Sequence, residues 1–105
     1  MNQSDLVNLI GNMLTQLDNT LMTLDPTSAQ WTQLYALRKH LDDQQRDLVA
    51  SSIAADDVQF QTLTGLITTA NNALTAQIAA QNQIAAVINT VAQVSANLDQ
   101  VLKMV

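Results

Sequence analysis

The chain has 105 residues, no cysteine and a formal net charge of −5, which suits one domain spanning 1–105. The lack of cysteine excludes disulfides and thiolate metal sites, and four basic residues cannot neutralise a row of phosphates, so we expect no nucleic-acid partner. With two Gly and one Pro, turns are too few for a β-sandwich or barrel, and we predict an all-α antiparallel bundle of three or four helices.

Two amphipathic helices are predicted in the N-terminal half, over about 5–24 and 26–50. Ser4 is the expected N-cap of the first helix. The run Asp25-Pro26-Thr27-Ser28 separates the two helices, because the residue before a proline is pushed out of the α region. With Asp25 as the second N-cap, so short a turn makes the helices antiparallel neighbours. The apolar stripes are Val7, Ile10, Leu14, Leu17, Leu21 and Leu24, then Trp31, Leu34, Leu37, Leu41 and Leu48.

The C-terminal half is predicted to form helices over about 54–70 and 73–104, with Ser52 as a cap. A break is expected near 68–72, where Thr and Asn have poor helix propensity. However, one heptad phase of apolar residues runs from Phe60 to the C-terminus, and a loop need not preserve such a phase. One continuous helix is therefore an alternative, and its free half would pair with another copy of the chain.

The stretch between Asp57 and Asp99 contains no charged residue. An uncharged surface loses its water more cheaply than a charged one, and polar residues in an apolar seam can fix the register of paired helices. We therefore predict a non-enzymatic protein that acts through helix–helix contacts, with itself as a homo-oligomer or with another helical protein. The predicted interface residues are Gln77, Gln81, Ile84, Ile88, Val91, Ser95 and Leu98.

Patterns that would carry chemistry are weak in this sequence. His40 is the only histidine, and no nucleophile is placed beside it, so we expect a surface histidine. Neighbours such as Asp42-Asp43 and Asp56-Asp57 point about 100° apart on a helix and do not chelate a cation as pairs. The chain has no Glu for a di-iron bundle and no glycine-rich phosphate loop. We predict no catalytic residue, no metal, no cofactor and no small-molecule substrate.

The segment from Leu17 to Leu48, two amphipathic helices joined at Asp25-Pro26-Thr27-Ser28, resembles the helical hairpin of type III secretion needle subunits. The richness in Asn, Gln, Thr and Ala without Cys is similar to exported filament subunits such as flagellins. The resemblance covers about a third of the chain and implies an alternative function, as a leaderless exported component of a bacterial secretion, filament or toxin system.

Membrane association is expected to be peripheral at most. No stretch of 18 residues is apolar throughout, so we expect no integral membrane span. The N-terminus shows no basic segment followed by an apolar core, so no secretory signal is expected, and the default compartment is the cytoplasm. A further alternative is that an amphipathic helix binds an apolar or lipid surface.

Overall fold

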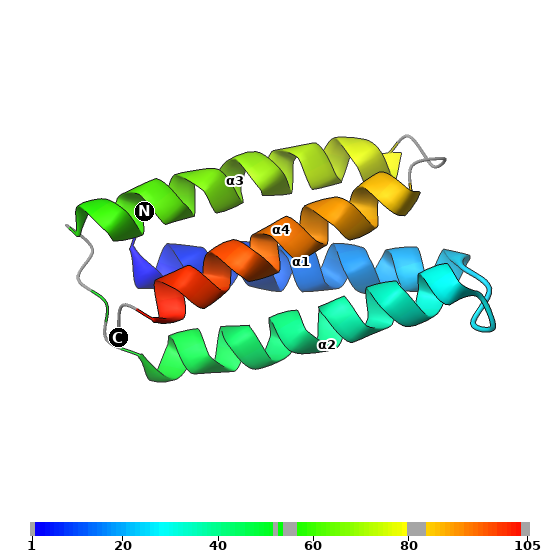
Figure 1. The fold of residues 1–105 in the computed structure, drawn as a ribbon, viewed down its shortest axis with the longest axis horizontal. Helices are drawn as coiled ribbons and strands as arrows, with labels where there is room; N and C mark the ends of the chain where they lie inside the picture. The colour runs from blue at the N-terminus through cyan, green and yellow to red at the C-terminus, as the bar shows by residue number, and fades with distance from the viewer. Residues whose placement is uncertain (1, 52, 54–56, 80–83, 104–105) are drawn as a thin grey trace.

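Four α-helices make up the fold. The computed structural model describes residues 2–51, 53, 57–79 and 84–103, and every regular element within them is helical. The helices are α1 (Gln3–Thr23), α2 (Ala29–Ala50), α3 (Val58–Ala79) and α4 (Ile84–Leu102). The predicted all-α antiparallel bundle is confirmed in its four-helix form (Figure 1).

The bundle consists of two antiparallel hairpins, α1–α2 and α3–α4, laid against each other (Figure 1). It is elongated, with principal extents of 42 × 22 × 18 Å. Contacts between the hairpins run from α2 to α4 and from α1 to α3, while α2 and α3 lie diagonally opposite. The colours in Figure 1 show that α1 and α3 run in the same direction, as do α2 and α4. Consecutive helices are therefore antiparallel, as predicted, while each contact between the hairpins joins two helices that run in the same direction.

One hydrophobic core fills the space between the four helices. Its residues recur at spacings of three, four or seven along each helix, which places them on one face of that helix. Full burial of one such side chain contributes roughly 1.5–3 kcal/mol. The core residues are Leu6, Ile10, Met13, Leu14, Leu17, Leu21, Leu34, Leu41, Leu48, Phe60, Leu63, Ile67, Leu74, Val87, Val91, Val94, Leu98 and Val101.

The start of α1 differs from the prediction. Asn2 Oδ1 accepts a hydrogen bond from the Asp5 amide (2.8 Å), and Asp5 Oδ2 accepts one from the Asn2 amide (3.0 Å). This reciprocal pair is a capping box, and it satisfies two amides that a helix start otherwise leaves unpaired. The prediction of Ser4 as N-cap is therefore wrong, and Ser4 lies in the first turn of α1.

The second helix begins three residues later than predicted. Ser28 Oγ accepts a hydrogen bond from the Trp31 amide (3.1 Å), so Ser28 and not Asp25 is the N-cap of α2. Asp25 shapes the turn before it, since its Oδ1 accepts hydrogen bonds from the amide (2.9 Å) and hydroxyl (2.8 Å) of Thr27. These two hydrogen bonds lower the pKa of Asp25 from its ordinary value of 3.8, and the bond from the Thr27 amide has the larger effect.

The third helix runs further than predicted. Asp57 Oδ1 caps its start by accepting a hydrogen bond from the Phe60 amide (3.0 Å). The predicted cap, Ser52, lies outside the described residues, as do residues 54–56. The break expected near 68–72 is absent, because α3 continues to Ala79. Ile67 and Leu74 are buried on either side of 68–72, and this packing overrides the poor helix propensity of that segment.

The alternative of one long C-terminal helix is wrong, because α3 and α4 lie side by side as a hairpin (Figure 1). The chain is helical up to Ala79 and again from Ile84, while residues 80–83 lie outside the described part. Folding back lets the stripe of α4 enter the core of its own chain. In a single chain, a continuous helix would leave that apolar stripe exposed to water, and the free energy gained by burying it would be lost.

Candidate functional site

The predicted interface residues divide into buried and partly exposed groups. Val91, Ser95 and Leu98 are buried within the bundle, with exposed fractions of 1 %, 6 % and 0 %. A second chain can reach them only if the bundle opens, so they are core positions of the folded monomer. Gln77, Ile84 and Ile88 are half-buried, and Gln81 lies outside the described residues. The structure thus leaves half of the described members of this set partly accessible to a partner.

A buried polar cluster joins α2 to α4. Gln44 Nε2 donates hydrogen bonds to the Ser95 carbonyl oxygen (2.9 Å) and to Asp99 Oδ1 (2.7 Å). Ser95 Oγ donates to Gln44 Oε1 (3.1 Å), so both ends of the Gln44 amide are paired. A buried polar group without a partner is costly, so this cluster favours one alignment of α2 against α4.

Each neighbouring pair of helices is joined by at least one glutamine. Between α1 and α2, Gln45 Nε2 donates to the Val7 carbonyl oxygen (3.2 Å) and Gln3 Nε2 to those of Leu48 and Ser51. Between α1 and α3, the Thr75 hydroxyl donates to Gln16 Oε1 (3.3 Å), and between α3 and α4, the Thr90 hydroxyl donates to Gln77 Oε1 (2.8 Å). The partner of Gln77 thus lies within its own hairpin. Amide side chains therefore contribute to the contact between every pair of neighbouring helices.

His40 has Asp99 as its polar partner among the described residues. Its Nε2 lies 3.7 Å from Asp99 Oδ1, and both side chains are about half exposed, at 53 % and 52 %. The nearby polar cluster contains one hydroxyl, that of Ser95, which is buried and donates a hydrogen bond to Gln44. Among the residues that the structure describes, no group of three or more possible metal ligands gathers. The geometry at His40 supports an ion pair between α2 and α4 when the imidazole is protonated.

Charge is divided unequally between the two hairpins. The α1–α2 hairpin carries ion pairs between Arg38 and Asp18 (2.8 Å) and between Arg46 and Asp42 (2.9 Å). The hydrogen bond from Arg38 to Asp18 raises the pKa of the Arg38 guanidinium. By contrast, Asp99 is the only ionisable residue in the sequences of α3 and α4.

Between Val58 and Leu98 the described part of the α3–α4 hairpin exposes no ionisable side chain, and its outer surface is called here the uncharged face. It follows residues at spacings of three and four on each helix, which keeps them on one side. Leu66, with 51 % of its surface exposed, is its largest apolar side chain. Gly65, the residue before Leu66, is open to solvent, because a Cβ atom there would meet nothing within 4 Å. The residues of the uncharged face are Leu66, Thr69, Ala73 and Ala76 of α3 and Ala85, Asn89, Ala92 and Ala96 of α4, all exposed.

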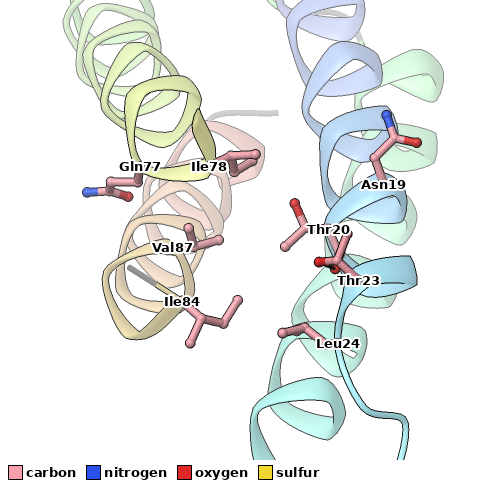
Figure 2. Close-up of a pocket in the computed structure, with 8 residues that line it drawn as sticks. All are labelled: Asn19, Thr20, Thr23, Leu24, Gln77, Ile78, Ile84 and Val87. Atoms are coloured by element: carbon pink, nitrogen blue, oxygen red, sulfur yellow. Dashed lines mark hydrogen bonds between the residues drawn. The ribbon is translucent and has the colours of Figure 1, made fainter. Parts of the chain in front are cut away.

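A groove of about 550 Å³ opens where the C-terminal end of α1 faces the turn end of the α3–α4 hairpin. Figure 2 shows Ile78, Ile84 and Val87 pointing towards α1, and Thr20 and Leu24 pointing back across the gap. This space is called here the α1–α3 groove. Its lining residues are Asn19, Thr20, Thr23, Leu24, Gln77, Ile78, Ile84 and Val87.

Sequence reasoning missed Gln44, although a signal for it exists. Gln44 stands between Leu41 and Leu48 at spacings of three and four, on the stripe that begins with Leu34 and Leu37. A polar residue on an apolar stripe predicts a buried polar contact, and Gln44 has only 2 % of its surface exposed. The α1–α3 groove carries no such periodic signal, because three separate helix ends build it.

Comparison with known proteins adds no relative. A scan of protein-family models, a search of curated proteins and a search of solved structures each find no match to this chain. Among the described helices, none combines the length and the apolar character that crossing a membrane requires. Any functional conclusion therefore depends on the surfaces and contacts of the chain itself.

Proposed function

We propose that this protein acts without catalysis, by self-association through the uncharged face of the α3–α4 hairpin. The observation that supports this proposal is the unequal distribution of charge between the two hairpins. From Val58 to Leu98 the described helices expose amides, hydroxyls, alanines, Val58 and Leu66, but no ionisable group. Docking there requires no charged side chain to lose its water, which is the costly step for polar surfaces.

A second copy of the chain is the partner that the charges favour. Two molecules with a net charge of −5 repel each other most where their acidic residues meet. Six of the nine acidic residues belong to the α1–α2 hairpin and its turn, for example Asp42, Asp43 and Asp47 of α2. Contact through the uncharged faces keeps these carboxylates apart. Small side chains such as Ala73 and Ala92 also let two helices approach closely.

The size of the uncharged face suits a small homodimer interface. Two helices of about 30 Å that lie side by side, spaced about 10 Å apart, present roughly 600 Å² to a partner. Stable interfaces bury about 800 Å² on each side, and weak or transient ones bury less. We therefore expect association in the micromolar range and a dependence on protein concentration.

The test compares matched alanine substitutions on the two hairpins. Ala73 on α3 and Ala36 on α2 are both exposed alanines well inside their helices. Sedimentation velocity across a range of concentrations should show mass above the 11.4 kDa of one chain for the unchanged protein and for Ala36→Asp. Ala73→Asp should remain a monomer with unchanged circular dichroism. A strict monomer at high micromolar concentration, or equal association of both variants, would refute the proposal.

A further inference from the structure

The α1–α3 groove lies at the least closely packed of the four helix contacts. α1 and α3 meet less extensively than any other neighbouring pair. One sign of this is Asn71, whose buried Oδ1 accepts no hydrogen bond from the described protein. Asn71 precedes Ile78 by seven residues and so shares its face of α3. The contact between α1 and α3 thus leaves a buried polar atom without a hydrogen bond. At the C-terminal ends of the two helices this contact opens into the groove.

The walls of the groove are mainly aliphatic. Leu24 contributes from the end of α1, while Ile78 of α3 and Ile84 and Val87 of α4 face it (Figure 2). None of the residues that line the groove is ionisable. A charged ligand would therefore lose its water with no opposite charge to replace it, and burying an unpaired charge is strongly unfavourable. The groove selects for an uncharged, aliphatic body.

The polar edge of the groove offers hydrogen-bond acceptors. The Thr20 hydroxyl donates to the Gln16 carbonyl oxygen (2.9 Å), and the Thr23 hydroxyl donates to the Thr20 carbonyl oxygen (2.7 Å). A hydroxyl has one proton, so each of these oxygens keeps only lone pairs for a ligand. Gln77 lines the groove, but its side chain points away from it in Figure 2 and accepts from Thr90. Asn19 also lines the groove and carries an amide donor, but its side chain points away from the gap in Figure 2. The two threonine hydroxyls therefore favour a ligand that donates a hydrogen bond.

We propose that the α1–α3 groove binds an uncharged aliphatic molecule that carries a hydroxyl group. The aliphatic chain lies between Leu24 and the Ile78, Ile84 and Val87 side chains, and the hydroxyl donates to Thr20 or Thr23. The volume of about 550 Å³ falls within the range of about 300–1,000 Å³ that is common for small-molecule sites. The ligand is bound and not transformed, and the site is separate from the uncharged face.

The first test compares 1-octanol with octanoate, which have the same chain length but differ in charge near neutral pH. In ¹H–¹⁵N correlation spectra, 1-octanol should shift the amides of Thr20, Leu24, Ile78 and Ile84 saturably. Octanoate should bind at least about tenfold more weakly, because its carboxylate meets no cation in the groove. Equal binding of the two molecules, or shifts spread evenly over the bundle, would overturn the proposal.

A second test uses matched variants of α1 and α4. Ile84→Asp places a charge in the groove wall at the first residue of α4, where the helix dipole tolerates an acid, and it should abolish 1-octanol binding. Met22→Asp, at a residue with 84 % of its surface exposed, should leave binding unchanged. Binding by Ile84→Asp equal to that of the unchanged protein would contradict the assignment of the aliphatic wall.

The acceptor is tested by a pair of threonines that make the same backbone hydrogen bond. Thr20→Val removes the groove oxygen and keeps the side-chain shape, and it should weaken 1-octanol binding several-fold. Thr15→Val removes a hydroxyl that also donates four residues back, to the Gly11 carbonyl oxygen (3.2 Å), but does not line the groove. The proposal requires Thr15→Val to bind as the unchanged protein does; equal weakening in both variants would refute the role of Thr20.

Discussion

The two hairpins use different chemistry for the same structural tasks. In the α1–α2 hairpin, Arg38 makes two hydrogen bonds to Asp18 (2.8 and 3.2 Å), and charged side chains cover the outside of α2. In the α3–α4 hairpin, the corresponding cross-helix bond is the neutral one from Thr90 to Gln77 (2.8 Å). Both hairpins bury aliphatic stripes of the same periodicity. The difference lies in how the polar contacts and the surface respond to salt, pH and a partner.

Neutral polar side chains make a protein surface easier to dehydrate when it contacts a partner. An ion pair on the surface is hydrated and screened, and it contributes little. An amide–hydroxyl bond such as that of Gln77 with Thr90 is not screened by salt, and the outer side chains around it lose water at lower cost. Charge repulsion disfavours contact through the α1–α2 hairpin, whereas the outer side chains of the α3–α4 hairpin oppose contact less. This division is the physical basis of the proposed self-association.

The largest expected effect comes from placing charge in the core of the uncharged hairpin. Val91→Asp buries a carboxylate without a partner and should cost more than about 4 kcal/mol, a large share of the stability of a small domain. Urea titration followed by circular dichroism measures this loss. Asn89→Asp, on the exposed side of the same helix, is the control and should change little. A Val91→Asp chain that unfolds at the same urea concentration as the unchanged protein would show that α4 is not packed as described.

The next effect concerns the contact between the two hairpins. Gln44→Leu keeps the volume but leaves Ser95 Oγ without its acceptor in a buried site, so it should cost about 1–3 kcal/mol. Adding Ser95→Ala removes that unpaired hydroxyl and should recover part of the loss. Denaturant midpoints of the two single variants and the double variant measure the coupling. Additive losses would mean that the Gln44–Ser95 bond does not hold the hairpins together.

The helical stripes could be predicted from the sequence, but the helix ends could not be predicted fully. Apolar residues at spacings of three and four repeat along every helix, so the core of all four follows from this signal. Caps depend on single residues that compete locally: Asn2 forms a two-way capping box that Ser4 does not form, and Ser28 displaces Asp25. The segment 68–72 stays helical because the packing of buried residues on either side of it outweighs local propensity.

The sequence indicates which polar residues lie on apolar helix faces, but it does not indicate which residues they bind. The sequence indicates Gln77 and Ser95 as polar positions in an apolar seam, and both pair across helices, but with Thr90 and Gln44 of the same chain. Periodicity gives the face of a helix and not the identity of its neighbour. The α1–α3 groove depends on how three helix ends are placed in space, which no local pattern specifies.

A smaller effect separates the two kinds of cross-helix bond directly. Arg38→Gln should lower the free energy of unfolding by about 0.5–1 kcal/mol at low salt and by less at high salt, because the pair with Asp18 is partly exposed and screened. Thr90→Val, which removes the bond to Gln77, should cost about 1 kcal/mol at both salt concentrations. Urea titrations at the two ionic strengths give both values. A salt-dependent loss in Thr90→Val would contradict the contrast between the hairpins.

The smallest effect lies at the turn of the charged hairpin and depends on pH. The pKa of Asp25 is lowered from 3.8 by its hydrogen bonds with Thr27, so the ionised carboxylate stabilises the turn above that value. This contribution is lost as the pH falls through the lowered pKa of the folded state. Asp25→Ala should therefore melt at a slightly lower temperature than the unchanged protein near neutral pH, and the difference should shrink in strong acid, where the protonated carboxyl is only a neutral acceptor. Asp25→Asn keeps an acceptor oxygen that does not titrate, so its difference from Asp25→Ala should persist at every pH. If Asp25→Ala instead differs from the unchanged protein equally at both pH values, then the side-chain charge of Asp25 does not stabilise the turn.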